Sequence, residues 1–173
     1  MENLSQDMIR IAGVVKESTV DGPGFRYVVF TQGCPHKCEG CHNPETHDLR
    51  GGKLVSIQKL VDDINQNPLL KGVTISGGEP FMQGKEVANL ISKLDKKRHT
   101  VMVYTGFEYE ELLAHANEEN HFLEILQNTD VLIDGKFDIN QKDENVMFRG
   151  SRNQRAIEAK NSINEGKIIL HEF

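Results

Sequence analysis

Short apolar runs alternate along the chain with segments of helical periodicity. The apolar runs predict strands over residues 10–16, 25–31, 73–75, 100–104 and 130–133. Between them, apolar residues recur every three or four positions, which predicts helices over residues 57–64, 87–94, 108–116 and 119–127. Because strands that alternate with helices form parallel sheets, the pattern predicts an α/β fold with a mostly parallel sheet.

The ends of these elements and the length of the chain refine the prediction. Ser56 is the expected N-cap of the first helix, and Pro68 lies just past the end of that helix. Two weaker strand candidates, residues 155–159 and 167–171, follow near the C-terminus. No repeat or long linker divides the chain, so we expect a single domain over residues 1–173. A closed barrel of eight units needs roughly 200 residues or more, which favours an open, partial (β/α) barrel.

Unusual polar and glycine-rich segments follow the predicted strands. A cysteine-rich loop follows the strand at residues 25–31, and Ser-Gly-Gly-Glu-Pro at residues 76–80 follows the next strand. Residues 104–106 and 134–136 end two later strands with Tyr-Thr-Gly and Asp-Gly-Lys. In parallel α/β sheets, ligands bind at the carboxyl ends of the strands. We therefore expect these four segments to face one shared cavity.

Composition and charge narrow the class of protein. Apolar residues make up 38% of the chain and charged residues 27%, values that are ordinary for a globular protein. The net charge is −6, and without a basic face the chain is not expected to bind nucleic acid. No apolar run is long enough to cross a bilayer, and the first seven residues lack the features of a signal peptide. We therefore expect no membrane association and a cytoplasmic location, where thiols stay reduced.

All three cysteines of the chain lie within eight residues, at Cys34, Cys38 and Cys41. Three thiolates so close in sequence can bind one metal centre, whereas a disulfide between two of them would leave the third alone. An iron–sulfur cube normally takes four thiolates, so three would leave one iron open for chemistry. A Cys3His zinc site is the alternative. Its fourth ligand would be one of the neighbouring histidines His36, His42 and His47.

The Gly77-Gly78 pair, followed by Glu79, is the second strong feature. Glycines directly after a strand let the backbone approach a ligand closely, because no Cβ stands in the way. A plain turn from strand to helix would have the same composition. The place of the pair, one strand–helix unit after the cysteines, favours a role in binding a ligand.

Taken together, Cys-x3-Cys-x2-Cys followed by Gly-Gly-Glu-Pro resembles the radical S-adenosylmethionine (SAM) superfamily. This resemblance implies a [4Fe-4S] cluster whose open iron chelates the amino and carboxylate groups of SAM. One electron from the cluster then breaks a C–S bond of SAM and yields methionine and a 5′-deoxyadenosyl radical. Zinc has no redox chemistry and could not supply that electron. The implied metal ligands are Cys34, Cys38 and Cys41, and the implied SAM contacts are Gly77, Gly78 and Glu79.

A narrower resemblance extends over nearly the whole chain. The sequences Thr-Val-Asp-Gly-Pro-Gly at residues 19–24 and Cys-His-Asn at residues 41–43 are similar to those of glycyl-radical-enzyme activases. These enzymes remove a Cα hydrogen from a partner protein and leave a stable glycine radical. The resemblance implies further cofactor contacts at Gly40, Cys41, His42, Asp134 and Lys136.

Two features favour one branch of these activases. Many radical SAM enzymes have an aromatic residue before the third cysteine, whereas this chain has Gly40, as do the activases of anaerobic (class III) ribonucleotide reductases. Residues 149–155 are also similar to a segment of those activases. We therefore expect an oxidoreductase that installs a glycyl radical on the catalytic subunit of an anaerobic ribonucleoside-triphosphate reductase. Reduced flavodoxin or ferredoxin is the expected electron donor.

Three alternatives stay open from the sequence. The partner could be a glycyl radical enzyme of the pyruvate formate-lyase type. The chain could instead be a radical SAM enzyme that acts on a small molecule, although little chain remains to form an additional pocket. A zinc-stabilised binding module is the alternative that involves no catalysis.

Overall fold

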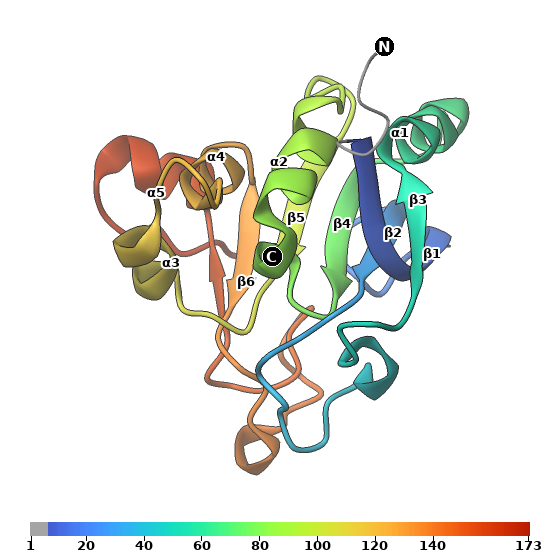
Figure 1. The fold of residues 1–173 in the computed structure, drawn as a ribbon. Coiled ribbons are helices and arrows are strands. Elements are labelled where there is room, and N and C mark those ends of the chain that lie inside the picture. Colours follow the sequence, from blue (N-terminus) through green and yellow to red (C-terminus); the bar gives the residue numbers. More distant parts are fainter. Residues whose placement is uncertain (1–6) are drawn as a thin grey trace.

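One open sheet of seven strands forms the centre of the molecule in the computed structural model, which describes residues 7–173 (Figure 1). The strands are β1 (Met8–Ser18), β2 (Arg26–Thr31), β3 (Lys53–Ser56), β4 (Gly72–Gly77), β5 (Thr100–Tyr104), β6 (Val131–Asp134) and β7 (Arg155–Ile157). Their order across the sheet is β3-β1-β2-β4-β5-β6-β7. The four strands from β2 to β6 in this order pair in parallel, whereas β3, β1 and β7 join by antiparallel pairing.

Helices follow most of the parallel strands. The α-helices are α1 (Ile57–Gln66), α2 (Gly84–Ser92), α3 (Tyr109–His115), α4 (Phe122–Gln127) and α5 (Ala159–Glu165). Short 3-10 helices include η2 (Pro44–Thr46), η3 (Pro80–Gln83) and η4 (Ile139–Gln141). As predicted, Ser56 caps α1, and its Oγ accepts a hydrogen bond from the backbone N–H of Lys59 at 3.3 Å. No helix among residues 7–173 has the length and apolar character needed to cross a bilayer.

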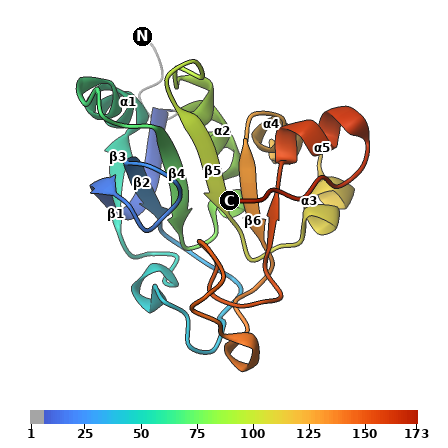
Figure 2. The same cartoon turned by 180° about the vertical axis from the view of Figure 1, so that it is seen from behind.

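The helices pack against one face of the sheet and bury the main core there. Helix α2 lies in front of β5 in Figure 1 and behind it in Figure 2. Alternate residues of the central strands, such as Val73 and Ile75 of β4, join this core together with Leu90 of α2. Met102 of β5 points to the other face and packs in a smaller cluster with Ile133 of β6. Both faces of the parallel strands are therefore apolar, as is usual for such sheets.

A buried arginine fills part of the second face. Arg26 of β2 has no exposed surface, and its Nε donates to Oγ1 of Thr74 at 2.8 Å. Its terminal nitrogens donate to Oγ1 and O of Thr100 and to the carbonyl of Val73. Burial lowers the pKa of the Arg26 guanidinium to about 10. These hydrogen bonds satisfy the guanidinium without a contacting carboxylate, and they tie the start of β2 to the starts of β4 and β5.

The predicted α/β class and most of the predicted elements are confirmed. The strand expected at residues 155–159 is shorter and pairs antiparallel as β7. The expectation of a strand at residues 167–171 was wrong, because that segment makes only an isolated bridge between Leu170 and Ile157. The pattern also gave no sign of α5 or of β3, a strand formed by pairing with the distant β1. The expectation about a signal peptide rests largely on residues 1–6, which lie outside the described part of the chain.

The four parallel strands end at the same edge of the sheet. Long loops after β2 and β6 gather at this edge, which is the lower side of the molecule in Figure 1. The opposite edge carries the short connections into the strands. The four polar and glycine-rich segments that follow the strands therefore come together at the carboxyl edge.

Candidate functional site

The three cysteines and the glycine pair line one cavity at the carboxyl edge. A cavity of about 130 Å³ is bordered by the three thiols, by Gly77 and Gly78, and by the loops that follow β5 and β6. A larger cavity of about 620 Å³ adjoins it and shares its wall at His42, Tyr104 and Phe137. The prediction that the four unusual segments face one cavity is therefore confirmed.

The loop that carries the cysteines is held by backbone hydrogen bonds at both ends. At its start, the N–H of Gly33 donates to the carbonyl of Thr46 at 2.7 Å, and the carbonyl of Gly33 accepts from the N–H of Glu79 at 2.7 Å. At its end, the carbonyl of His47 accepts from the N–H of Cys34 at 3.3 Å, so the end of the loop is bonded to its start. The loop is therefore anchored to the end of β4, the strand that leads into the glycine pair.

The thiols of Cys34, Cys38 and Cys41 are half-buried and form no disulfide. Burial raises the pKa values of the Cys34 and Cys38 thiols. Within residues 7–173, no three His, Cys, Asp or Glu side chains already stand in an arrangement that would hold a metal ion. The three-cysteine ligand set thus stays a prediction. It fits the chemistry of the cavity, because soft thiolates are the usual ligands of iron–sulfur clusters and all three border the same space.

The glycine pair packs against the cysteine loop. A Cβ on Gly77, which has a φ of 94°, would lie 2.5 Å from the backbone nitrogen of Thr31. A Cβ on Gly78 would lie 2.8 Å from the carbonyl carbon of Gly33. Real Cβ atoms do not approach backbone this closely, so both positions exclude side chains. The glycines therefore bring the end of β4 against the cysteine loop, as well as leaving their own backbone open toward the cavity.

Glu79, the third predicted SAM contact, is turned away from the cavity. Its side chain has no exposed surface, and its oxygens contact His36, Thr105 and Gly106. It does not belong to the cavity wall as the structure describes it. A direct contact between this carboxylate and SAM stays a prediction that the geometry of its hydrogen bonds does not favour.

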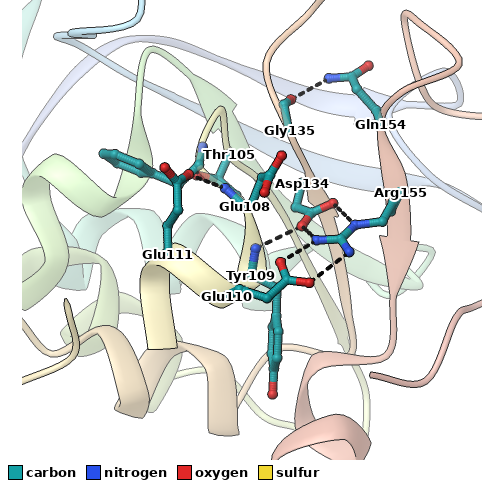
Figure 3. A network of polar contacts seen from close by, with 10 residues as sticks. Thr105, Glu108, Tyr109, Glu110, Glu111, Asp134, Gly135, Gln154 and Arg155 are labelled. Atoms are coloured by element: carbon teal, nitrogen blue, oxygen red, sulfur yellow. Dashed lines mark hydrogen bonds and ion pairs between the residues drawn. The ribbon is translucent and has the colours of Figure 1, made fainter. Parts of the chain in front are cut away.

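Asp134 is engaged in a network of ion pairs at the end of β6 (Figure 3). Its Oδ1 accepts from Nε of Arg155 at 3.0 Å, and its Oδ2 accepts from the backbone N–H of Tyr109 at 2.8 Å. Arg155 also forms a two-pronged contact with Glu110, with nitrogen–oxygen distances of 3.0 and 2.7 Å. The Asp134 carboxylate is 1% exposed and does not line the cavity. Its role in binding SAM remains a prediction. In this structure the carboxylate holds Arg155 and the backbone N–H of Tyr109.

Lys136 and Gly40 lie beside the cavity rather than in its wall. Lys136 is exposed, and its ammonium favours the thiolate form of Cys38. Gly40 has a φ of 73°, and a Cβ there would lie 2.9 Å from Cδ1 of Ile139 and 3.4 Å from the ring of Phe137. The loop after β6 therefore packs where the side chain of residue 40 would otherwise lie.

His42 does line the cavity, where its ring packs against Phe137 with ring centroids 5.0 Å apart.

Phe137 was not singled out from the sequence, since a single phenylalanine in a loop has no diagnostic pattern. Gln154 was also missed as an individual residue, although the segment 149–155 drew attention. Its Nε2 donates to the carbonyl of Gly135 at 3.0 Å, and its Oε1 accepts from the N–H of Gly150 at 2.8 Å.

Comparison with known proteins agrees with this geometry. The model of the 4Fe-4S single cluster domain family matches residues 20–157. The anaerobic ribonucleoside-triphosphate reductase-activating protein of Enterobacteria phage T4 is 34% identical over 143 residues, which are 79% of this chain and 85% of that protein. The protein of the same name from Escherichia coli K12 is 30% identical over 144 residues, with 78% and 89% of the two chains covered.

Two further similarities are partial. The pyruvate formate-lyase-activating enzyme of Clostridium pasteurianum is 38% identical over 120 residues, which are 64% of this chain but 50% of that enzyme. Among solved structures, QueE from Escherichia coli matches with a TM-score of 0.46 and 22% identity, over 61% of this chain and 57% of QueE. The family match over most of the chain is much stronger than either of these. The chain belongs to the 4Fe-4S single cluster domain family and, within the radical SAM superfamily, to the anaerobic ribonucleoside-triphosphate reductase-activating proteins.

Proposed function

We propose that this protein activates an anaerobic ribonucleoside-triphosphate reductase by generating a glycyl radical on its catalytic subunit. The observation that carries the proposal is the meeting of three free thiols and a close-packed glycine pair at one cavity. The two relatives with the matching printed name are matched over 85% and 89% of their length, whereas the pyruvate formate-lyase-activating enzyme is matched over 50% of its length. The reductase is therefore the favoured partner.

In this proposal, Cys34, Cys38 and Cys41 hold a [4Fe-4S] cluster with one iron left open for SAM. When bound, the cluster supplies the electron that cleaves SAM, and the resulting radical removes the glycine hydrogen of the partner. The half-buried position of the thiols limits the access of water and oxygen to this centre. Burial raises the pKa values of the Cys34 and Cys38 thiols, so cluster assembly would release protons from the loop.

Residues of the chain itself orient SAM and receive the partner. The backbone of Gly77 and Gly78 borders the cavity and can offer its polar groups to the amino acid part of SAM. His42 and Phe137 form an aromatic wall on the side where the larger cavity opens. That cavity, of about 620 Å³, has the size to admit a short glycine-containing segment of a partner.

The architecture suits a macromolecular substrate. We assign the sheet to the open partial (β/α) barrel of the radical SAM type, formed by a single domain over residues 1–173. Between the edge strands β3 and β7 the sheet stays open, and a partner surface can close that gap. A small reduced flavodoxin or ferredoxin would donate the electron from outside.

The test combines the anaerobically reconstituted protein with reductant, SAM and a purified reductase catalytic subunit. We expect a glycine-centred doublet in electron paramagnetic resonance on the reductase, together with 5′-deoxyadenosine. Pyruvate formate-lyase, offered in parallel, should give no doublet. Turnover of a small-molecule substrate other than SAM without any partner, or a protein that contains zinc and no iron, would contradict the proposal.

A further inference from the structure

We propose that His36 and Glu79 are positioning residues that lock the middle of the cysteine loop in place before any cluster binds. Cys34 and Cys38 flank His36 in the sequence, and Glu79 directly follows the glycine pair. A contact between the two side chains therefore links the thiols to the end of β4. The inference rests on the proposed function only for the identity of the group that the thiols bind.

Both oxygens of the Glu79 carboxylate are occupied. Its Oε1 accepts a hydrogen bond from Oγ1 of Thr105 at 2.5 Å. Its Oε2 accepts from the backbone N–H of Gly106 at 3.0 Å and lies 3.0 Å from Nε2 of His36. A carboxylate has only acceptors, so the imidazole donates from Nε2. Because the Glu79 side chain has no exposed surface, no water can replace these partners.

The His36 ring lies in a slot that has room for it because residue 106 is glycine. A Cβ on Gly106 would lie 2.7 Å from Nε2 of His36 and 2.8 Å from its Cγ. On another side, the ring packs edge-on against Phe107, with ring centroids 4.6 Å apart. Only 6% of the His36 side chain is exposed, although the residues on either side of it in the loop are exposed. The His36 ring is therefore fixed by its contacts with Glu79, Gly106 and Phe107 and does not point to solvent.

The consequence is a loop that is fastened at three places. Backbone hydrogen bonds join its start to its end, from the N–H groups of Gly33 and Cys34 to the carbonyls of Thr46 and His47, and His36 fastens the part between them. Lys37, which follows, adopts a φ of 50°, a conformation that a lysine keeps only when its surroundings impose it. In this proposal, Glu79 positions the cysteine loop through its contact with His36 and does not contact SAM.

The test uses the metal-free protein, in which a maleimide alkylates the thiols at rates that peptide mass spectrometry resolves for each cysteine. The chain has three cysteines and all lie in this loop, so every signal reports on it. We expect His36→Ala and Glu79→Ala to raise the alkylation rates of Cys34 and Cys38 by about tenfold, because a buried, charge-assisted hydrogen bond is lost. Circular dichroism checks that the variants fold.

Three further variants separate positioning from a general loss of stability. His36→Gln keeps a donor nitrogen within reach of Glu79, so it should restore slow alkylation. Gly106→Ala should expel the imidazole and match His36→Ala, and it should add nothing in a protein that already carries His36→Ala. His121→Asn is the matched control, because His121 forms an exposed pair with Glu124 on α4 at 2.9 Å, away from the cysteines.

A second readout uses the cluster-loaded protein. Positioning predicts a lower iron and sulfide content in Glu79→Ala, with an unchanged KM for SAM in the fraction that is loaded. A full cluster with a raised KM would show that Glu79 binds SAM, and it would overturn the proposal. Wild-type alkylation rates in both His36→Ala and Glu79→Ala would overturn it as well. Failure of the wild-type protein to produce a glycyl radical would refute the proposed function alone, since the alkylation rates do not depend on it.

Discussion

Gly78 packs against the peptide group of Gly33, so that a side chain at position 78 would lie 2.8 Å from the Gly33 carbonyl carbon. The two residues belong to the end of β4 and to the start of the cysteine loop. The residue after Gly78, Glu79, donates its backbone N–H to the carbonyl of Gly33 at 2.7 Å. This close approach of the two backbone segments sets the position of the cysteine loop relative to the glycine pair.

Gly78→Ala should therefore displace the cysteine loop. We expect a loss of about 1–3 kcal/mol in the free energy of unfolding, because the added methyl group has no space, and a lower iron content after reconstitution. Urea unfolding and iron analysis measure the two effects. Gly13→Ala in β1 is the matched control, since a Cβ there meets nothing within 4 Å. Full iron content in Gly78→Ala would show that the loop tolerates the displacement.

Cys38→Ala should abolish cluster binding without unfolding the chain. The thiol lies in a loop at the edge of the sheet, outside the core formed by the strands and helices. We expect iron and sulfide to fall to background, 5′-deoxyadenosine formation to stop, and the circular dichroism spectrum to remain that of the wild type. Normal SAM cleavage by this variant would contradict the assignment of the metal ligands.

Arg155→Ala should destabilise the fold through Asp134. Loss of the guanidinium leaves a carboxylate that is 1% exposed with the backbone N–H of Tyr109 as its remaining partner. We expect a loss of about 2–3 kcal/mol in the free energy of unfolding, reduced from the value for a fully buried pair because Arg155 is partly exposed. Denaturant titration measures it.

The control for this variant is Lys16→Ala, which removes an exposed ion pair with Asp63 and should cost less than about 1 kcal/mol. If Asp134 instead served SAM, Arg155→Ala would leave the free energy of unfolding unchanged and raise the KM for SAM. That outcome would restore the role expected from the sequence.

Tyr27 should make the protein less stable in alkali. Burial, assisted by its 2.8 Å hydrogen bond to Asp63, raises the pKa of Tyr27 above the ordinary value of 10.0. Above pH 10 the unfolded chain releases the phenolic proton while the folded chain keeps it, so stability falls as the pH rises. The loss amounts to about 1.4 kcal/mol per pH unit for this one proton.

Tyr27→Phe removes that proton. Above pH 10, we expect the free energy of unfolding of this variant to decline less steeply than that of the wild type, and the two slopes should differ by the contribution of one proton. Between pH 7 and 9, Tyr27 should add no slope to the wild-type profile. Urea titrations at several pH values measure the slopes. Equal slopes for the two proteins would show that Tyr27 ionises normally in the folded state.

Local patterns were sufficient to predict the elements that depend on neighbours in sequence. The helix at residues 57–64 was predictable because its apolar spacing and its cap at Ser56 are both local, and α1 occupies Ile57–Gln66. β3 was not predictable, because four residues with weak alternation form a strand only by pairing with β1. The segment 167–171 is the opposite case. Its sequence is strand-like, but it forms only an isolated bridge, between Leu170 and Ile157, and no strand.

The candidate site divides in the same way. Cysteine spacing and the glycine pair were sufficient to predict that the two motifs meet at one cavity at the ends of parallel strands, because both signals lie within short motifs. Which groups the carboxylates bind could not be predicted from the sequence. Asp134 ends a strand and Glu79 follows one, both in polar, ligand-like sequences. Even so, Arg155 and His36, which are distant from them in the chain, bind these two carboxylates.

By itself, the sequence determined the family and the α/β class and singled out the three cysteines as the expected cluster ligands, since each of these depends on residue types at short spacing. Only the tertiary structure decided which of the polar side chains at the carboxyl edge face the cavity and which are turned into the fold. The physical reason is that a buried carboxylate must find donors, and long-range contacts alone decide where those donors lie.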